Sequence, residues 1–280
     1  MVAGVPEGRA RRCRPAGAGV PVGARCHTRD MSTRASSLTA SGWAAGPLLG
    51  FDTETTGVDP LGDRLVTAAL VSRGPRRADG TRSQEVRTWL ADPGVVIPEA
   101  AAAVHGVTTE RARTEGRPAP EVLEEVAGAL AAAMAQGTPV VVFNASFDLT
   151  LMEAELARHG LATLSERLGR VPAPVLDPLV LDRAADHWRK GKRRLSDMCA
   201  VYGVRVDEAL HTAEVDVAAT LDVLEAIARV HPAIGGTDLS ALQGLQVDAH
   251  RAWAGSFNRW LARQGRTPDA DPSWPLARRN

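Results

Sequence analysis

The segment from Pro47 to Gly57, PLLGFDTETTG, places the strongest constraint on the fold of this chain. A short apolar run ends in Asp52 and Glu54 and breaks into a polar turn at Thr55. In a strand, successive side chains point to opposite faces, so positions 52 and 54 share one face. Two carboxylates at the end of a buried strand repel each other unless a divalent cation lies between them. The alternative is a surface strand end whose acids face water.

The segments that follow indicate an α/β fold. Three extended segments joined by short turn-rich links come first, over residues 48–52, 64–72 and 84–91. Two further strands, at 138–143 and 175–177, alternate with helices expected over 121–134, 146–159, 178–188, 195–202 and 212–229. Strands joined by short turns pair antiparallel, whereas strands connected through helices pair parallel. The chain is therefore predicted to form a mixed five-stranded sheet, an antiparallel meander followed by parallel strands, flanked by helices.

Composition divides the chain into three parts. Residues 1–43 are rich in Gly, Pro, Ala, Arg and Ser without an apolar period, and we expect them to be a disordered tail. Seven arginines against two acidic residues give this tail a charge of +5, so the neutral chain leaves −5 on the remainder. Residues 44–232 form the expected central domain. Residues 233–280 are expected to be a linker, an amphipathic helix over 239–264 and a C-terminal tail.

Composition also argues against two classes of protein. No run approaches eighteen apolar residues, so neither a transmembrane helix nor a membrane partner is expected. The three cysteines, Cys13, Cys26 and Cys199, do not resemble a disulfide framework, which favours a cytoplasmic protein. Because the part beyond the tail is mildly acidic, any contact with nucleic acid would be local.

A second acidic position follows the strand at 138–143. Asn144 is a residue type favoured at helix N-caps, and Asp148 falls in the first turn of the helix expected after it. Strand-to-helix connections of this kind carry the active sites of many α/β folds. An ordinary alternative is that Asp148 only complements the helix dipole.

A third group combines His211 and Asp216. Asp216 is expected on the inward face of the last central helix, where an acid is unusual unless it is paired or binds metal. His211 precedes it by five residues, about 500° of helical rotation, so His211 belongs to the loop before the helix. A loop histidine there suits a general base, although it is also compatible with simple exposure to solvent.

Three further sequence features can each be interpreted as functional or as structural. His105 lies in a predicted link, VHGVT, where it could contact a substrate or have no function. The basic loop from Trp188 to Arg194 could bind phosphates or be a solvated turn. On the C-terminal helix, Trp253, Phe257 and Trp260 share one face, which could pack on the main domain or dock a partner or nucleic acid.

Together these motifs resemble the DnaQ-like (DEDDh) family of 3′–5′ exonucleases, which has a ribonuclease H-like fold. The resemblance extends from about Gly46 to Arg229. It rests on four motifs: Phe51–Gly57, Val104–Thr108, Asn144–Asp148 and His211–Asp216. The histidine five residues before the last acid matches the histidine class of this family rather than its tyrosine class.

The resemblance implies roles for particular residues. It implies four ligands for two divalent cations, Mg²⁺ or Mn²⁺, namely Asp52, Glu54, Asp148 and Asp216. These acids and His211, which would deprotonate the attacking water, are the implied catalytic residues. Four positions match the pocket for the terminal nucleotide: Thr53, His105, Asn144 and Phe147.

The implied reaction is hydrolysis of the terminal phosphodiester of a single-stranded 3′ end, DNA being favoured, with release of nucleoside 5′-monophosphates. It would serve DNA repair, proofreading or nucleic-acid turnover, with a polymerase or repair partner bound through the C-terminal helix. Two alternatives stay open. One is a 3′–5′ exoribonuclease acting on short RNA or tRNA ends, and the other is a catalytically silent nucleic-acid-binding module.

Overall fold

The computed structural model describes residues 42–205 and 213–278. Of the predicted N-terminal tail, residues 1–41 lie outside the described residues. Gly42 and Trp43 belong instead to a short 3-10 helix, η1 (Gly42–Ala45), whose Ala44 is buried. His211 and the predicted helix cap Thr212 also lie outside the described residues.

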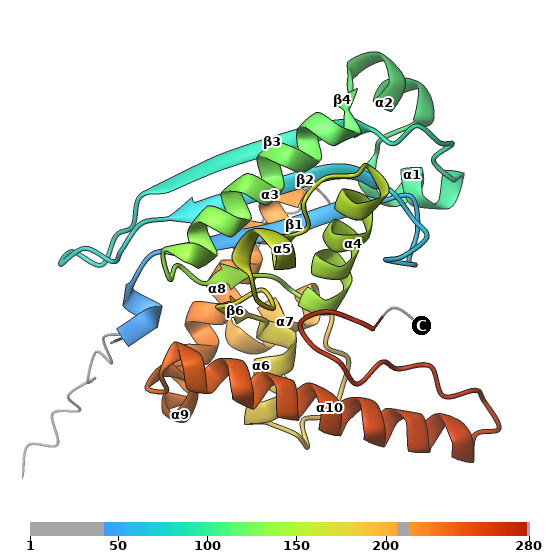
Figure 1. Cartoon of the computed structure of the whole chain (residues 1–280). Coiled ribbons are helices and arrows are strands. Elements are labelled where there is room, and N and C mark those ends of the chain that lie inside the picture. The colour runs from blue at the N-terminus through green and yellow to red at the C-terminus, as the bar shows by residue number, and fades with distance from the viewer. Residues whose placement is uncertain (1–41, 206–212, 279–280) are drawn as a thin grey trace, which may run out of the picture. The chain divides into compact units, whose positions relative to one another are not determined.

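The centre of the fold is a six-stranded mixed sheet in the order β4-β3-β2-β1-β5-β6 (Figure 1). β1 pairs antiparallel with β2, and β2 with β3, whereas β5 and β6 run parallel to β1. This confirms the predicted meander followed by parallel strands. The unpredicted sixth strand, β4, is two residues long and pairs parallel with β3. The strands are β1 (Leu48–Thr55), β2 (Leu65–Arg73), β3 (Gln84–Asp92), β4 (Arg117–Pro118), β5 (Val140–Val141) and β6 (Val175–Leu176).

The predicted long helices are present, with ends shifted by at most a few residues. They are α3 (Ala119–Ala135), α4 (Ala145–Arg158), α6 (Pro178–Ala185), α7 (Leu195–Tyr202), α8 (Ala213–Val230) and α10 (Leu239–Arg263). Four short helices were not predicted: α1 (Glu99–His105), α2 (Thr109–Glu115), α5 (Leu164–Leu168) and α9 (Pro232–Gly235). Each is seven residues or shorter, too short for an apolar period to be recognised. Within the described residues, no helix has the length and apolar character needed to cross a bilayer.

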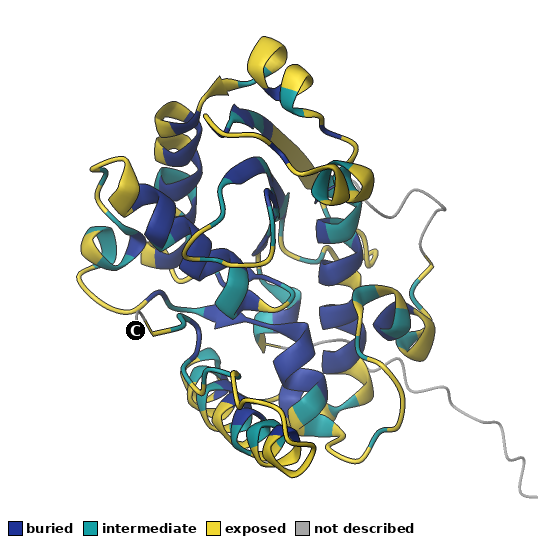
Figure 2. Ribbon diagram, turned by 90° about the vertical axis from the view of Figure 1, so that its right-hand side faces the viewer, coloured by how far each residue is buried: buried dark blue, intermediate teal, exposed yellow. Residues whose placement is uncertain are grey.

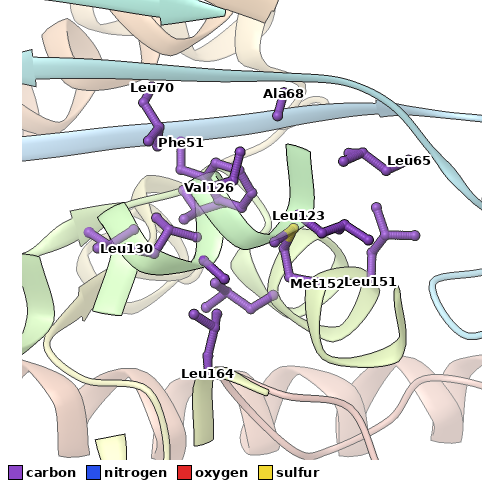
Figure 3. Packing of buried hydrophobic residues seen from close by; sticks show 14 of the residues in the cluster. Phe51, Leu65, Ala68, Leu70, Leu123, Val126, Leu130, Leu151, Met152 and Leu164 are labelled. Carbon is purple, nitrogen blue, oxygen red and sulfur yellow. The ribbon is translucent and has the colours of Figure 1, made fainter. Parts of the chain in front are cut away.

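One face of the sheet is covered by α3 and α4, and α5 packs against these two helices. Figure 3 shows side chains of β1 and β2, such as Phe51 and Leu70, pointing toward Leu123 and Val126 of α3. Phe51 is 1% exposed and belongs to the larger of the apolar clusters. Because β1 alternates, Phe51 and the odd-numbered residues after it face this α3–α4 side.

The opposite face of β1 packs against α8. The contact is closest at Gly50, where an added Cβ would fall inside the van der Waals radius of the Val217 side chain. Only glycine lets the helix approach the strand this closely. Leu48 on β1 and Leu221 on α8 complete an apolar cluster on this side, both almost fully buried.

α10 lies along the edge of the sheet beyond β6 and packs against α6 (Figure 1). Its inward residues are buried while its outer side is exposed, as the lowest helix in Figure 2 shows. The segment after α10 then returns to the main body. Trp274 joins the α3–α4 cluster with 6% exposure, and the amide of Ala277 donates to the Thr150 hydroxyl on α4 (2.8 Å). Residues 239–278 are therefore packed against the central domain.

Candidate active site

The end of β1 presents Asp52 and Glu54 toward α8, as the strand period predicted. Both are half-buried, and they alternate with Thr53 and Thr55, which are buried. Asp52 lies opposite Ala69 of β2, and the pairing slips by one residue just after Glu54. Such irregularities bend a strand locally and re-aim its side chains. The two acids therefore lie where regular pairing ends.

The start of α4 is held by a residue that the sequence analysis did not identify. Asn144 does occupy the N-cap position, but its side chain makes no capping bond, and its backbone is left-handed (φ 65°). The capping acceptor is Asp177, at the end of β6. Its carboxylate accepts from the amides of Asn144 (3.1 Å) and Ala145 (2.9 Å). The predicted N-cap position of Asn144 is confirmed, but the helix amides are satisfied by the Asp177 carboxylate and not by the Asn144 side chain.

Asp148 lies in the first turn of α4, as predicted, and is 4% exposed. Its Oδ1 accepts from the Thr53 amide (3.1 Å) and the Thr53 hydroxyl (2.6 Å). These bonds connect the start of α4 directly to β1 between Asp52 and Glu54. Asp148 therefore reaches the strand end that carries the other two acids.

The fourth acid, Asp216, lies in the first turn of α8 and is half-buried. Ala219, Thr220 and Val223, its predicted companions on the inward face, are buried. Asp216 is close enough to raise the pKa of both Asp52 and Glu54. The structure therefore brings acids from β1, α4 and α8 together.

The electrostatics of this group are dominated by burial and mutual repulsion. Burial, followed by the charges of Asp148, Glu54 and Asp216, raises the pKa of Asp52 well above its ordinary value. Burial and Asp216 raise the pKa of Glu54 to about 7. Burial raises the pKa of Asp148 to about 7 as well, although the hydrogen bonds from Thr53 oppose the shift. Protonation or a cation is needed to relieve this repulsion.

The donor set suits a hard divalent cation, because all four side chains offer carboxylate oxygens. Across residues 42–205 and 213–278, no three His, Cys, Asp or Glu side chains are already gathered tightly enough to hold one ion. Of the four acids, Asp148 already has its Oδ1 engaged by two hydrogen bonds from Thr53. The chemistry of the residues fits metal binding, whereas the fully closed coordination geometry is not preformed.

The predicted substrate residues lie around the acids in different settings. His105 is the last residue of α1 rather than part of a loop, and its Nδ1 accepts from the Val107 amide (3.2 Å). It lines a cavity of about 240 Å³ together with Glu54, Trp89 and Arg111. A larger hollow of about 910 Å³ lies at the other end of β1, around Leu48 and Arg73, away from the acids.

The other substrate positions lie on the opposite side of β1. Asn144 is exposed and Phe147 half-buried at the start of α4, while Thr53 is buried and bonded to Asp148. The cavity that contains His105 and Glu54 does not include these three residues. Of the four predicted substrate positions, only His105 lines this cavity.

The basic loop is partly internal. Arg189 and Arg193 both pair with Asp182, which is fully buried on α6 (2.8 and 2.7 Å). Tyr202 donates to the same carboxylate (2.8 Å). The two arginines therefore hold the loop against α6, and Tyr202 joins α7 to the same carboxylate, whereas Trp188 in the loop is 86% exposed.

The aromatic stripe on α10 packs against the main domain at one end and is exposed at the other. Trp253, Phe257 and Trp260 stack in a row with ring centroids 5.5 and 5.6 Å apart. The Arg183 guanidinium on α6 lies 3.8 Å from the Trp253 ring, so one end of the stripe contacts the main domain. Trp260 at the other end is 42% exposed.

Comparison with known proteins identifies the family of the chain. Residues 49–224 match the RNase T family, described as exonuclease. A curated relative from Rhodobacter capsulatus, a DNA polymerase III subunit epsilon-like protein, is 32% identical over 204 residues. That alignment covers 72% of this chain and 26% of the relative, so the chain spans about a quarter of that protein.

Solved structures of exonuclease I share the fold. The enzyme from Methylocaldum szegediense is 23% identical with a TM-score of 0.55, covering 68% of this chain and 42% of that one. Exonuclease I of E. coli in complex with a dA16 oligonucleotide is 18% identical with a TM-score of 0.56, covering 74% and 44%. Since the family match spans more than half of its residues, the chain belongs to the exonuclease family, as a DnaQ-like member of the ribonuclease H-like superfamily.

Proposed function

We propose that this exonuclease is metal-dependent and removes nucleoside 5′-monophosphates one at a time from single-stranded 3′ ends, with DNA as the favoured substrate. The observation that carries the proposal is the meeting of acids from β1, α4 and α8 around Asp52. Burial, together with repulsion from Asp148, Glu54 and Asp216, raises the pKa of Asp52 well above its ordinary value. A site that gathers like charges is suited to binding cations.

Asp52, Glu54, Asp148 and Asp216 would hold two divalent cations, Mg²⁺ or Mn²⁺. Bound there, such ions supply charge stabilisation for an in-line displacement at phosphorus. His211 would accept the proton of the attacking water, as a general base in the segment that leads into α8. His105, beside Glu54, is the residue we propose to contact the terminal nucleotide. Thr53, Asn144 and Phe147 would line the other side of that nucleotide.

The choice of single-stranded DNA is supported by the relatives. E. coli exonuclease I has been solved with dA16, dA13 and dT13 oligonucleotides, and one structure is described as a single-stranded DNA complex with zinc. The epsilon-like name of the Rhodobacter relative supports a polymerase connection, and an exonuclease I complex is named for the SSB C-terminus. We therefore propose that the exposed end of the α10 stripe, at Trp260, contacts a polymerase or repair partner.

Cleavage of a 5′-labelled single strand in Mg²⁺ tests the proposal. A 3′–5′ exonuclease leaves a ladder of shortened labelled products, whereas the opposite polarity releases a labelled mononucleotide at once. Asp52→Ala should abolish the ladder. Glu85→Ala, which removes an exposed acid on β3, is the matched control and should cleave like the wild type.

Matched DNA and RNA strands of one sequence determine the substrate class. If kcat/KM is higher on RNA than on DNA, RNA is the favoured substrate and this part of the proposal is wrong. If the wild-type protein binds single strands but leaves them intact in both Mg²⁺ and Mn²⁺, the proposed activity is wrong.

A further inference from the structure

The outer edge of β6 is closed by two glutamine side chains instead of another strand. The inner edge of β6 bonds to β5, through the Pro174 and Leu176 carbonyls. On the outer edge, the Val175 amide donates to Gln243 Oε1 (3.0 Å) and the Val175 carbonyl accepts from Gln246 Nε2 (2.9 Å). An open edge strand exposes unpaired backbone groups, so α10 completes the sheet at this side.

Gln246 extends this contact to the capping residue of α4. Its Oε1 accepts from the Asp177 amide at 2.7 Å, while its Nε2 also donates to the Leu242 carbonyl (3.1 Å). Gln246 is completely buried and Asp177 is 1% exposed. Every polar atom of the Gln246 amide is thus engaged, which fixes the position of the Asp177 backbone from the α10 side.

Asp177 in turn determines where α4 begins. Its carboxylate holds the amides of Asn144 and Ala145, and its Oδ1 also accepts from the Leu179 amide (2.9 Å) at the start of α6. Asn144 is the one described residue other than glycine with a left-handed backbone. Such a conformation persists only where surrounding contacts stabilise it. Asp148 follows one turn later and reaches Thr53 on β1.

We infer that Gln246 is a positioning residue for the active site: through Asp177 it holds the first turn of α4, and with it Asp148, in register with β1. Gln246 lies on α10, outside the 49–224 region matched by the family. The helix is therefore part of the catalytic architecture of this chain as well as a candidate docking surface. The inference rests on the proposed function only in taking Asp148 as part of the site.

The test compares Gln246→Met with Leu242→Ala in the full-length protein. Leu242 is also completely buried on α10, one turn away, but its side chain packs in the α8-side cluster and, being apolar, cannot hydrogen-bond to Asp177. Both variants loosen the docking of α10, so both should lower Tm. Gln246→Met alone should lower kcat by about ten- to a hundredfold with KM nearly unchanged, because a small misplacement of a reacting group has effects of that size.

Two readouts do not depend on turnover. Mn²⁺ binding, followed by electron paramagnetic resonance, should weaken about tenfold in Gln246→Met and stay within twofold of wild type in Leu242→Ala. Hydrogen exchange at the amides of Asn144 and Ala145 should accelerate about tenfold more in Gln246→Met than in Leu242→Ala.

The outcomes separate the inference from the proposed function. The positioning role is overturned if Gln246→Met lowers Tm but leaves kcat, Mn²⁺ affinity and amide protection at wild-type values. It is also overturned if Leu242→Ala changes these three quantities as much as Gln246→Met does. If the wild type cleaves nothing, the proposed function fails, and exchange at Asn144 and Ala145 still decides whether Gln246 fixes the start of α4.

Discussion

Asp148 on α4 accepts two hydrogen bonds from Thr53 on β1, one from its amide (3.1 Å) and one from its hydroxyl (2.6 Å). The two residues are 95 positions apart in the sequence. The contact aligns the start of α4 with the strand that carries Asp52 and Glu54. It also favours the ionised form of Asp148, since hydrogen bonds to a carboxylate lower its pKa.

Replacing Thr53 by valine should therefore impair activity in a pH-dependent way. The variant loses the hydroxyl bond, and a hydrogen bond to a charged group contributes about 1.5–3 kcal/mol. The pKa of Asp148 rises further, so the acid limb of the kcat/KM profile should move to higher pH by about one unit. Thr53→Ser keeps the hydroxyl and should follow the wild-type profile. A parallel drop at all pH values in the valine variant would contradict this.

Asp52→Asn should inactivate the enzyme and stabilise the metal-free protein. The substitution removes the ionised form of Asp52, which burial and three neighbouring carboxylates disfavour. The free energy of unfolding in EDTA should rise by about 1–3 kcal/mol, measured by urea denaturation. Saturating Mg²⁺ should then raise the Tm of the wild type more than that of the variant. A metal-free variant less stable than wild type would show that Asp52 is not under repulsion.

The stability of the metal-free protein should depend on pH through Glu54. Its folded pKa of about 7 exceeds the unfolded value of about 4.3. Between these values the folded state binds more protons than the unfolded state, so the free energy of unfolding falls as pH rises.

The variant Glu54→Gln isolates this contribution. Wild type and variant should be about equally stable near pH 4, and the variant should be more stable by about 1 kcal/mol at pH 8, a figure reduced for the partial exposure of Glu54. Urea denaturation in EDTA at the two pH values measures the difference. A difference in free energy of unfolding that is the same at both pH values would contradict the raised pKa of Glu54.

His211→Gln tests the proposed general base. Proton transfer by a positioned side chain contributes about 10²–10⁴-fold, so kcat should fall by that range. KM and Mn²⁺ affinity should stay near wild-type values, because His211 is not a proposed ligand. The acid limb that reports its ionisation should disappear from the pH–rate profile. Retention of more than a tenth of wild-type kcat would exclude this role.

Two tryptophans of the C-terminal part should differ in their contribution to stability. Trp274 is 6% exposed inside the α3–α4 cluster, and its replacement by alanine should cost about 3–5 kcal/mol. Trp260 is 42% exposed and stacks on Phe257, so Trp260→Ala should cost about 1 kcal/mol. Thermal denaturation of both variants measures the contrast. Equal losses would mean that Trp260 has a structural role like that of Trp274.

The sequence predicted the features that depend on periodicity. The apolar period of the long helices and the turn-separated strands were sufficient to predict a mixed sheet of an antiparallel meander followed by parallel strands, and α7 has the predicted bounds. The common face of Asp52 and Glu54 followed from strand alternation alone. The short helices were missed because they carry too few buried residues to show an apolar period. α1 has no buried residue and α2 only Ala112, so neither produces a pattern.

The supporting contacts of the site could not be predicted because they join distant segments. Asp177 precedes a proline at the start of α6, which is a helix N-cap signal, but nothing local shows that it also caps α4. Gln246 gives a weaker signal, as a polar residue on the inward face of an amphipathic helix. The charge of the 188–194 loop suggested an exposed basic surface, whereas two of its arginines form ion pairs with the buried Asp182.

The absence of a side chain at Gly50 has a consequence for genetics. Gly50 lies two residues before Asp52, and Val217, against which it packs, follows Asp216 directly. Any larger residue at position 50 would push α8 away from β1 and separate the two acids without altering either. A screen for folded but inactive variants should therefore recover substitutions at this position, and a compensating change to a smaller residue at Val217 should restore function.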